Sequence, residues 1–176
     1  MEQRSAAQLE TFLLAVRGRV EGLGSNRSAS GLPVPRLRYR RLHPHGEHAV
    51  SVQLNHTIVW CRDKRKSATF LTEILGLPKP VRFGPFLVVE LENGVSLDFH
   101  ATDAEIDSQH YAFLIGEADF DQIFGRIRER GLPHWADPGK HRAGEINRND
   151  GGRGVYFEDP DGHLLEIITR PYGAGG

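Results

Sequence analysis

The chain has little of several features that would assign it to a specialised class. A single cysteine, Cys61, rules out an intrachain disulfide and fits a reducing compartment. No histidine or base pattern accompanies Cys61, so we interpret it as a small apolar residue at the end of a strand. No apolar run is long enough to cross a bilayer, and the first residues lead into no signal-peptide core. These absences predict a cytoplasmic protein.

The chain also lacks an excess of charge of either sign. The formal net charge is −1 over 176 residues, so no global charge attracts nucleic acid or a membrane surface. We therefore expect a small-molecule substrate as partner, and neither nucleic acid nor membrane. The length suits one domain of moderate size, or two small similar modules that share a core.

Residues 1–50 differ from the rest and are interpreted as an N-terminal extension, partly helical or disordered. Apolar residues recur at helical spacing over residues 6–23, and a Gly/Ser-rich stretch and an arginine run follow. A cluster of histidines near residue 45 has the composition of a weak metal site, but its position favours a linker.

From residue 53 the pattern becomes regular and occurs twice. The first half predicts a helix that begins after Asp63 and ends at Gly76. The Asn93-Gly94 pair predicts a hairpin with a type I′ turn. The predicted strands of this half span residues 54–61, 80–83, 86–91 and 95–100.

The second half repeats this order. Asp119 or Asp121 is expected to cap a helix that stops at Gly131. The strands are expected at residues 110–115, 133–136, 154–157 and 164–169. Two β-α-β-β-β units of similar length predict an α+β domain over residues 51–172, with modules at 53–103 and 109–170.

An ionisable residue interrupts each of three otherwise apolar strands: His56, His110 and Glu166. Taken alone, each is most simply a partnered polar residue or part of an edge strand. Taken together, two imidazoles and one carboxylate at matching places of a repeat are the donor set of a metal site with open positions. We therefore predict that these three side chains bind one divalent metal ion.

The loop 137–153 is long and rich in Gly, Asn, Asp and Arg. Loops of this length without regular structure are usually functional or mobile. We expect this loop to cover the pocket of the predicted metal site, with Asn147, Asn149 and Arg153 as candidate substrate-binding residues. The alternative is a solvated surface loop.

The segment from Gly154 to Glu166 contains the turn Asp159-Pro160-Asp161-Gly162 between two apolar strands. With Leu54-Asn55-His56-Thr57-Ile58-Val59, the helix end Ile74-Leu75-Gly76-Leu77 and the His110 strand, it resembles the vicinal oxygen chelate superfamily. That superfamily includes glyoxalase I, bleomycin-resistance proteins, fosfomycin-resistance enzymes and extradiol dioxygenases. The resemblance covers residues 53–170.

The resemblance implies two βαβββ modules that form a curved open-barrel sheet around a central metal pocket. It places His56, His110 and Glu166 at the ligand positions for Fe, Mn, Ni, Zn or Co. Asp98 falls where glyoxalase-like members carry a fourth ligand, and it is a candidate ligand or a nearby carboxylate. His100 shares the face of Asp98, either lining the pocket to contact substrate or lying on a surface edge. Members often pair modules between chains, so a homodimer is one open arrangement.

Function follows from the resemblance in two versions. The first is a metal-dependent dioxygenase, isomerase or lyase that acts on a small substrate chelated through vicinal oxygens. Its candidate catalytic residues are Glu166 and Tyr156, the latter matching part of the extradiol signature, although the upstream histidine of that signature is absent. Tyr156 is alternatively a packed strand aromatic. The second version is a bleomycin-resistance-like protein that binds a drug or other ligand without catalysis.

Overall fold

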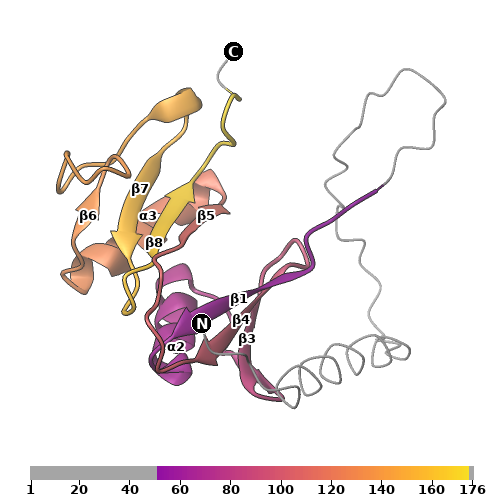
Figure 1. Ribbon diagram of the computed structural model, residues 1–176. Coiled ribbons are helices and arrows are strands. Elements are labelled where there is room, and N and C mark those ends of the chain that lie inside the picture. The colour runs from indigo at the N-terminus through magenta and orange to yellow at the C-terminus, as the bar shows by residue number, and fades with distance from the viewer. Residues whose placement is uncertain (1–50, 175–176) are drawn as a thin grey trace. The chain divides into compact units, whose positions relative to one another are not determined.

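The computed structural model describes residues 51–174, and within the chain the unit that begins at Leu54 is compact by itself (Figure 1). The predicted extension over residues 1–50, with its helix and histidine cluster, lies outside the described residues. Between residues 51 and 174, no helix combines the length and hydrophobicity that a membrane crossing requires.

The first module is a four-stranded sheet with one helix. Its sheet has the order β1-β4-β3-β2, in which β1 and β4 run parallel and β1 forms an edge. As predicted, Asp63 caps the helix by accepting hydrogen bonds from two backbone N–H groups, and Gly76 ends it at φ 75°. The elements are β1 (His56–Cys61), α2 (Lys64–Leu75), β2 (Val81–Phe83), β3 (Phe86–Glu90) and β4 (Ser96–Ala101).

The second module repeats this topology. Its sheet has the order β5-β8-β7-β6, again with the first strand at an edge and parallel to the last. The repeat of β-α-β-β-β units and the α+β class are therefore confirmed. The elements are β5 (His110–Leu114), α3 (Glu117–Glu129), β6 (His134–Trp135), the 3₁₀ turn η1 (Asn149–Gly151), β7 (Gly154–Glu158) and β8 (Leu164–Ile168).

The predicted hairpin joins β3 and β4, but its turn type and the predicted cap of α3 were wrong. Gly94 has φ 80° but Asn93 does not have a positive φ, so the turn is not type I′. Instead the Gly94 N–H donates to the carbonyl of Leu91, as in longer hairpin loops where a left-handed glycine follows the turn. Helix α3 begins one turn earlier than expected, with Gly116 at its N-cap, so Asp119 lies in the first turn and does not cap it.

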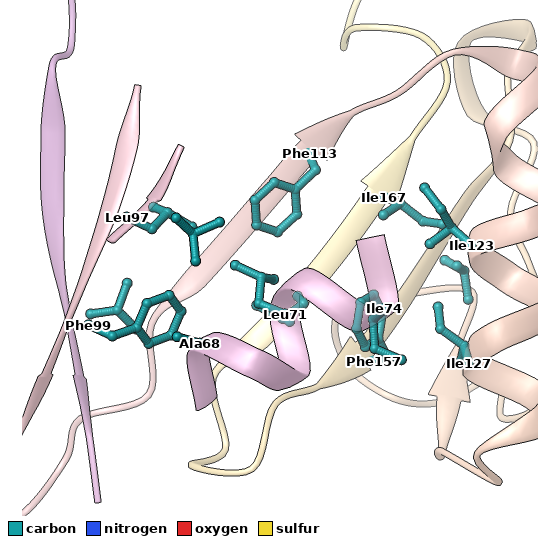
Figure 2. Packing of buried hydrophobic residues seen from close by; sticks show 14 of the residues in the cluster. Ala68, Leu71, Ile74, Leu97, Phe99, Phe113, Ile123, Ile127, Phe157 and Ile167 are labelled. Atoms are coloured by element: carbon teal, nitrogen blue, oxygen red, sulfur yellow. The ribbon is translucent and has the colours of Figure 1, made fainter. Parts of the chain in front are cut away.

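The two helices cover one face of each sheet and join the modules in one core. In Figure 2, Leu71 and Ile74 of α2 lie between Phe99 of the first sheet and Ile127 of α3, and Phe157 of the second sheet meets them. Because side chains alternate along a strand, residues adjacent to these core positions point to the opposite face of each sheet. Those opposite faces carry six of the candidate site residues: His56, Asp98, His100, His110, Tyr156 and Glu166.

The turn between β7 and β8 fastens the second module to the first. Asp161 accepts the backbone N–H of Arg62 at 2.8 Å and also the hydroxyl of Ser67 in α2. His163, only 1% exposed, lies between the modules. Its Nδ1 accepts the N–H of Gln109 at 3.0 Å, so its Nε2 carries the proton and donates to the carbonyl of Trp60 at 2.8 Å. The signature turn therefore has a structural task here.

Candidate metal centre

Strand register brings three predicted site residues onto one face of the second sheet. Glu166 on β8 pairs with Tyr156 on β7 and with Ala112 on β5. His110 is two residues from Ala112 and therefore shares this face. Leu165 and Ile167, the neighbours of Glu166, belong to the core on the side of α3. The carboxylate thus stands on the face of the sheet that α3 does not cover.

Glu166 and His110 are in direct contact. Their Oε2 and Nε2 atoms are 3.2 Å apart, and the side chain of Glu166 is 1% exposed while that of His110 is 44% exposed. The imidazole stacks on the ring of Tyr156, with centroids 5.9 Å apart. A buried carboxylate beside an accessible histidine has the nitrogen and oxygen donors that divalent transition metals accept.

A second tyrosine completes this cluster, and the sequence had not indicated it. The hydroxyl of Tyr172, from the C-terminal tail, donates to Oε2 of Glu166 at 2.8 Å and lies 3.2 Å from the hydroxyl of Tyr156. Burial first, and then hydrogen bonding with Glu166, raises the pKa of Tyr156, so its phenol keeps its proton at neutral pH.

His56 stands apart from this cluster. It lies on β1, on the face of the first sheet that α2 does not cover, and its Nδ1 is 2.8 Å from Oδ1 of Asn55. Within residues 51–174, no group of three or more His, Cys, Asp or Glu side chains is placed to hold a metal ion. One chain therefore brings together two of the three predicted ligands, His110 and Glu166.

Asp98 and His100 share the face of His56 on the first sheet. Asp98 is buried and accepts the hydroxyl of Ser96 at 3.0 Å. His100 packs edge-on against Trp60 and Phe86, with ring centroids 5.1 and 5.2 Å away. Register makes Asp98 a diagonal neighbour of His56, whereas His100 belongs to an aromatic cluster further along the strand.

The loop 137–153 is held by contacts of its own. Asn147 is buried, its side-chain amide donates to the carbonyl of Ala136, and its backbone bridges to Gly154. A Cβ on Gly154 would lie 2.8 Å from Oδ1 of Asn147, so a larger residue at this position would displace the Asn147 amide. Asn147 thus braces the loop, while Asn149 is exposed at the start of the 3₁₀ turn.

Arg153 is bound within the chain. Its guanidinium contacts Glu117 at 2.5 Å and Asp121 at 2.6 Å, both on α3, and lies 4.3 Å from the ring centroid of Phe120. These partners lie on the side of the second sheet opposite Glu166. The placement does not support the predicted substrate contact of Arg153 and favours a structural role.

The other basic side chains of this loop are mostly paired as well. Lys140 contacts Glu158, and both His141 and Arg142 contact Asp137. These pairs reduce the positive charge that the basic side chains of the loop could offer to an anionic ligand. They favour the alternative interpretation, in which 137–153 is a solvated surface loop.

Replacing Arg153 with alanine is expected to affect stability and not the metal site. The loss of packing over Phe120 should lower the free energy of unfolding by about 0.5–1 kcal/mol, while the solvent-exposed ion pairs add little. Urea unfolding and a Mn²⁺ titration of the same variant measure the two effects. A tenfold loss of metal affinity with unchanged stability would contradict this structural role.

Cys61 takes no part in the site. It is fully buried, and burial raises the pKa of its thiol to about 12. A thiol with so high a pKa is not a thiolate at neutral pH and is a poor nucleophile. The interpretation of Cys61 as an apolar residue at the end of β1 agrees with this environment.

Comparison with known proteins identifies the fold and the family. A sequence profile of the Glyoxalase/Bleomycin resistance protein/Dioxygenase superfamily matches residues 53–167. Among solved structures, oxidase ChaP-H1 is 65% identical and superposes with a TM-score of 0.69, covering 70% of this chain and 99% of its own. The FosX fosfomycin resistance protein of Listeria monocytogenes, solved as a variant with Mn(II), is 21% identical with a TM-score of 0.53, over 72% of this chain and 96% of its own, which shows the fold alone.

Among curated proteins, the glutathione transferase FosA of Serratia marcescens is 34% identical over 120 residues, 65% of this chain and 78% of its own length. These similar proteins are named as an oxidase and a transferase, and both are enzymes. The chain therefore belongs to the glyoxalase, bleomycin resistance protein and dioxygenase superfamily and is one of its enzymes.

Proposed function

We propose that this chain is a metal-dependent oxidase whose divalent ion is held by His110 and Glu166 of one copy and His56 of a second copy. The observation that carries the proposal is the buried carboxylate of Glu166 in contact with His110. The choice of an oxidase is supported by the 65% identity to oxidase ChaP-H1 over nearly all of that chain. The substrate is a small organic molecule that binds through vicinal oxygens.

The residues present fit a metal. Burying a carboxylate is costly unless it is paired or bound to an ion. Among residues 51–174, Glu166 has a histidine and a tyrosine beside it and no lysine or arginine ion pair. Imidazole and carboxylate suit Fe, Mn, Ni, Zn or Co, and the donor set does not choose among them. When bound, the ion would supply Lewis acidity and open positions for substrate oxygens.

A second copy would complete the ligand set. His56 and His110 each lie on an edge strand, β1 and β5 respectively. Edge strands expose backbone groups and are usually covered or paired. Setting β1 of one copy beside β5 of another would bring His56 to the His110–Glu166 pair. Two-fold symmetry would build two such sites per dimer.

The chain's other side chains have defined tasks in this arrangement. Tyr156 orients His110 by stacking and presents a protonated hydroxyl to the site. Asp98 would come with His56 as a further ligand or as a hydrogen-bond partner of one. Asn149 is exposed and stays a candidate for substrate contact, with His100 at the far end of the same sheet face as Asp98.

The similarities to glutathione transferase FosA and to the fosfomycin resistance protein FosX favour a second candidate function, in which glutathione is transferred to a small substrate such as fosfomycin. Both functions use the same metal site, so the ligands alone do not separate them. The identity is about half that to the oxidase, which ranks the transferase second.

Oxygen consumption separates the candidate functions. The purified chain, loaded in turn with Fe²⁺ and Mn²⁺, is offered a panel of catechols, hydroxyquinones and α-hydroxyketones in an oxygen electrode. We expect metal-dependent oxygen uptake that is lost in Glu166→Ala. Conversion of fosfomycin with glutathione, without oxygen uptake by any panel member, would instead support the transferase. Binding of the panel compounds without turnover would support a ligand-binding protein.

A further inference from the structure

We propose that Tyr172 is a positioning residue of the metal centre. In this account the C-terminal tail acts as a strap that holds the Glu166 carboxylate in place for the ion. The inference rests on the proposed metal site and adds a residue that lies beyond the segment matched by the superfamily, residues 53–167.

The hydrogen bonds around Tyr172 have only one consistent direction. An ionised carboxylate only accepts hydrogen bonds, so the Tyr172 hydroxyl donates its proton to Oε2 of Glu166, at 2.8 Å. The Tyr156 hydroxyl, 3.2 Å from that of Tyr172, must then be the donor to Tyr172. Two phenols thus form a chain that ends on the buried carboxylate.

The tail is fixed on both sides of Tyr172. After it, the N–H of Gly173 donates to Oδ1 of Asp150 at 3.2 Å. Before it, Thr169 Oγ1 accepts the backbone N–H of Arg153 at 2.9 Å. A Cβ on Gly152 would come within 2.9 Å of Arg170 Cγ, so the tail lies directly against the end of the loop 137–153. The tyrosine is held from both directions and is not a free chain end.

Metal binding would leave Tyr172 as the group that keeps Glu166 oriented. Oε2 of Glu166 now faces both His110 Nε2, at 3.2 Å, and the Tyr172 hydroxyl. If His110 and Glu166 both bind one ion through these atoms, their contact with each other is replaced by bonds to the ion. The Tyr172 bond can persist, and outer partners of this kind typically affect metal affinity by about 10–100-fold.

Tyr172 is accessible to solvent, although its hydroxyl reaches a buried group. The residue is 63% exposed while Glu166, which its hydroxyl reaches, is 1% exposed. One side of the tyrosine therefore faces solvent and its hydroxyl faces the carboxylate.

The test compares Mn²⁺ binding by the full chain with Mn²⁺ binding by three variants. Electron paramagnetic resonance measures both the affinity and the spectrum of the bound ion. Tyr172→Phe removes only the hydroxyl and should weaken Mn²⁺ binding by about tenfold or more, with an altered Mn²⁺ spectrum. Asp150→Ala loosens the tail and should weaken binding by a smaller factor. Tyr111→Phe, a tyrosine beside His110 on the core-facing side of β5, is the matched control and should bind like the unmodified chain.

The outcomes separate this inference from the proposed function. Unchanged Mn²⁺ affinity and spectrum in Tyr172→Phe, with tight binding by the unmodified chain, would overturn the strap and leave the metal site intact. Equal losses of affinity and thermal stability with an unchanged spectrum would also overturn it, because they indicate a purely structural tyrosine. Absence of Mn²⁺ binding by the unmodified chain would overturn the proposed site and the strap together.

Discussion

Replacing His110 with alanine is expected to weaken the binding of a divalent metal by one to two orders of magnitude or more. The reason is that His110 is the imidazole in contact with the buried Glu166 carboxylate, and even the loss of an outer partner costs about 10–100-fold. A Mn²⁺ titration of dialysed, metal-free protein measures the effect. The substitution should leave the fold intact because the side chain is 44% exposed and lies on an edge strand.

The matched control is His141→Ala, another accessible histidine, which contacts Asp137 on the surface loop. It should bind Mn²⁺ as the unmodified chain does. Full metal affinity in His110→Ala would remove His110 from the ligand set, and equal losses in both variants would indicate unspecific binding by surface histidines.

Replacing His163 with alanine is expected to lower the free energy of unfolding by about 2–4 kcal/mol. The substitution leaves a cavity between the modules and removes the partners of two backbone groups, the N–H of Gln109 and the carbonyl of Trp60. Urea unfolding followed by circular dichroism measures the change.

His134→Ala is the comparison for this prediction. His134 is half-buried, bonds the carbonyl of Leu132 and meets Phe124 edge-on, but both of these partners belong to its own module. His134→Ala should lower the free energy of unfolding clearly less than His163→Ala does. A loss below about 1 kcal/mol for His163→Ala would show that the turn does not fasten the modules as described.

Local rules predicted much of the fold. The Asp63 cap and the Gly76 stop are set by short-range hydrogen bonding and a left-handed backbone position, so the sequence alone indicated the limits of α2. Strand alternation likewise explains why Glu166 points away from Leu165 and Ile167, which are core residues. The predicted cap of α3 was wrong. Asp119 and Asp121 are both suitable capping residues by type, but the helix begins after Gly116, which has no side chain to cap it.

The candidate site was harder to predict because its parts depend on tertiary contacts. Tyr172 lies outside both repeats, and no spacing connects it with Glu166. Arg153 has the charge and hydrogen-bond donors of a ligand-binding residue. In the fold, two carboxylates of α3 bind its guanidinium instead. Nor does a sequence reveal whether His56 meets His110 within one chain or across two copies. That question depends on where the helices pack and which strands form edges.

The most direct test of a metal site shared between two copies is metal binding by a mixed dimer, made from two variant chains that each lack one predicted ligand. His56→Ala and His110→Ala chains with different affinity tags are co-expressed, and the species that carries both tags is isolated and titrated with Mn²⁺. If the site joins two copies, each variant alone lacks tight binding, while the mixed dimer regains one tight site per two chains, built from the intact His56 of one and the intact His110 and Glu166 of the other. If the mixed dimer binds no Mn²⁺ tightly while the unmodified chain does, or if no mixed species forms, the account of a site shared between copies is contradicted.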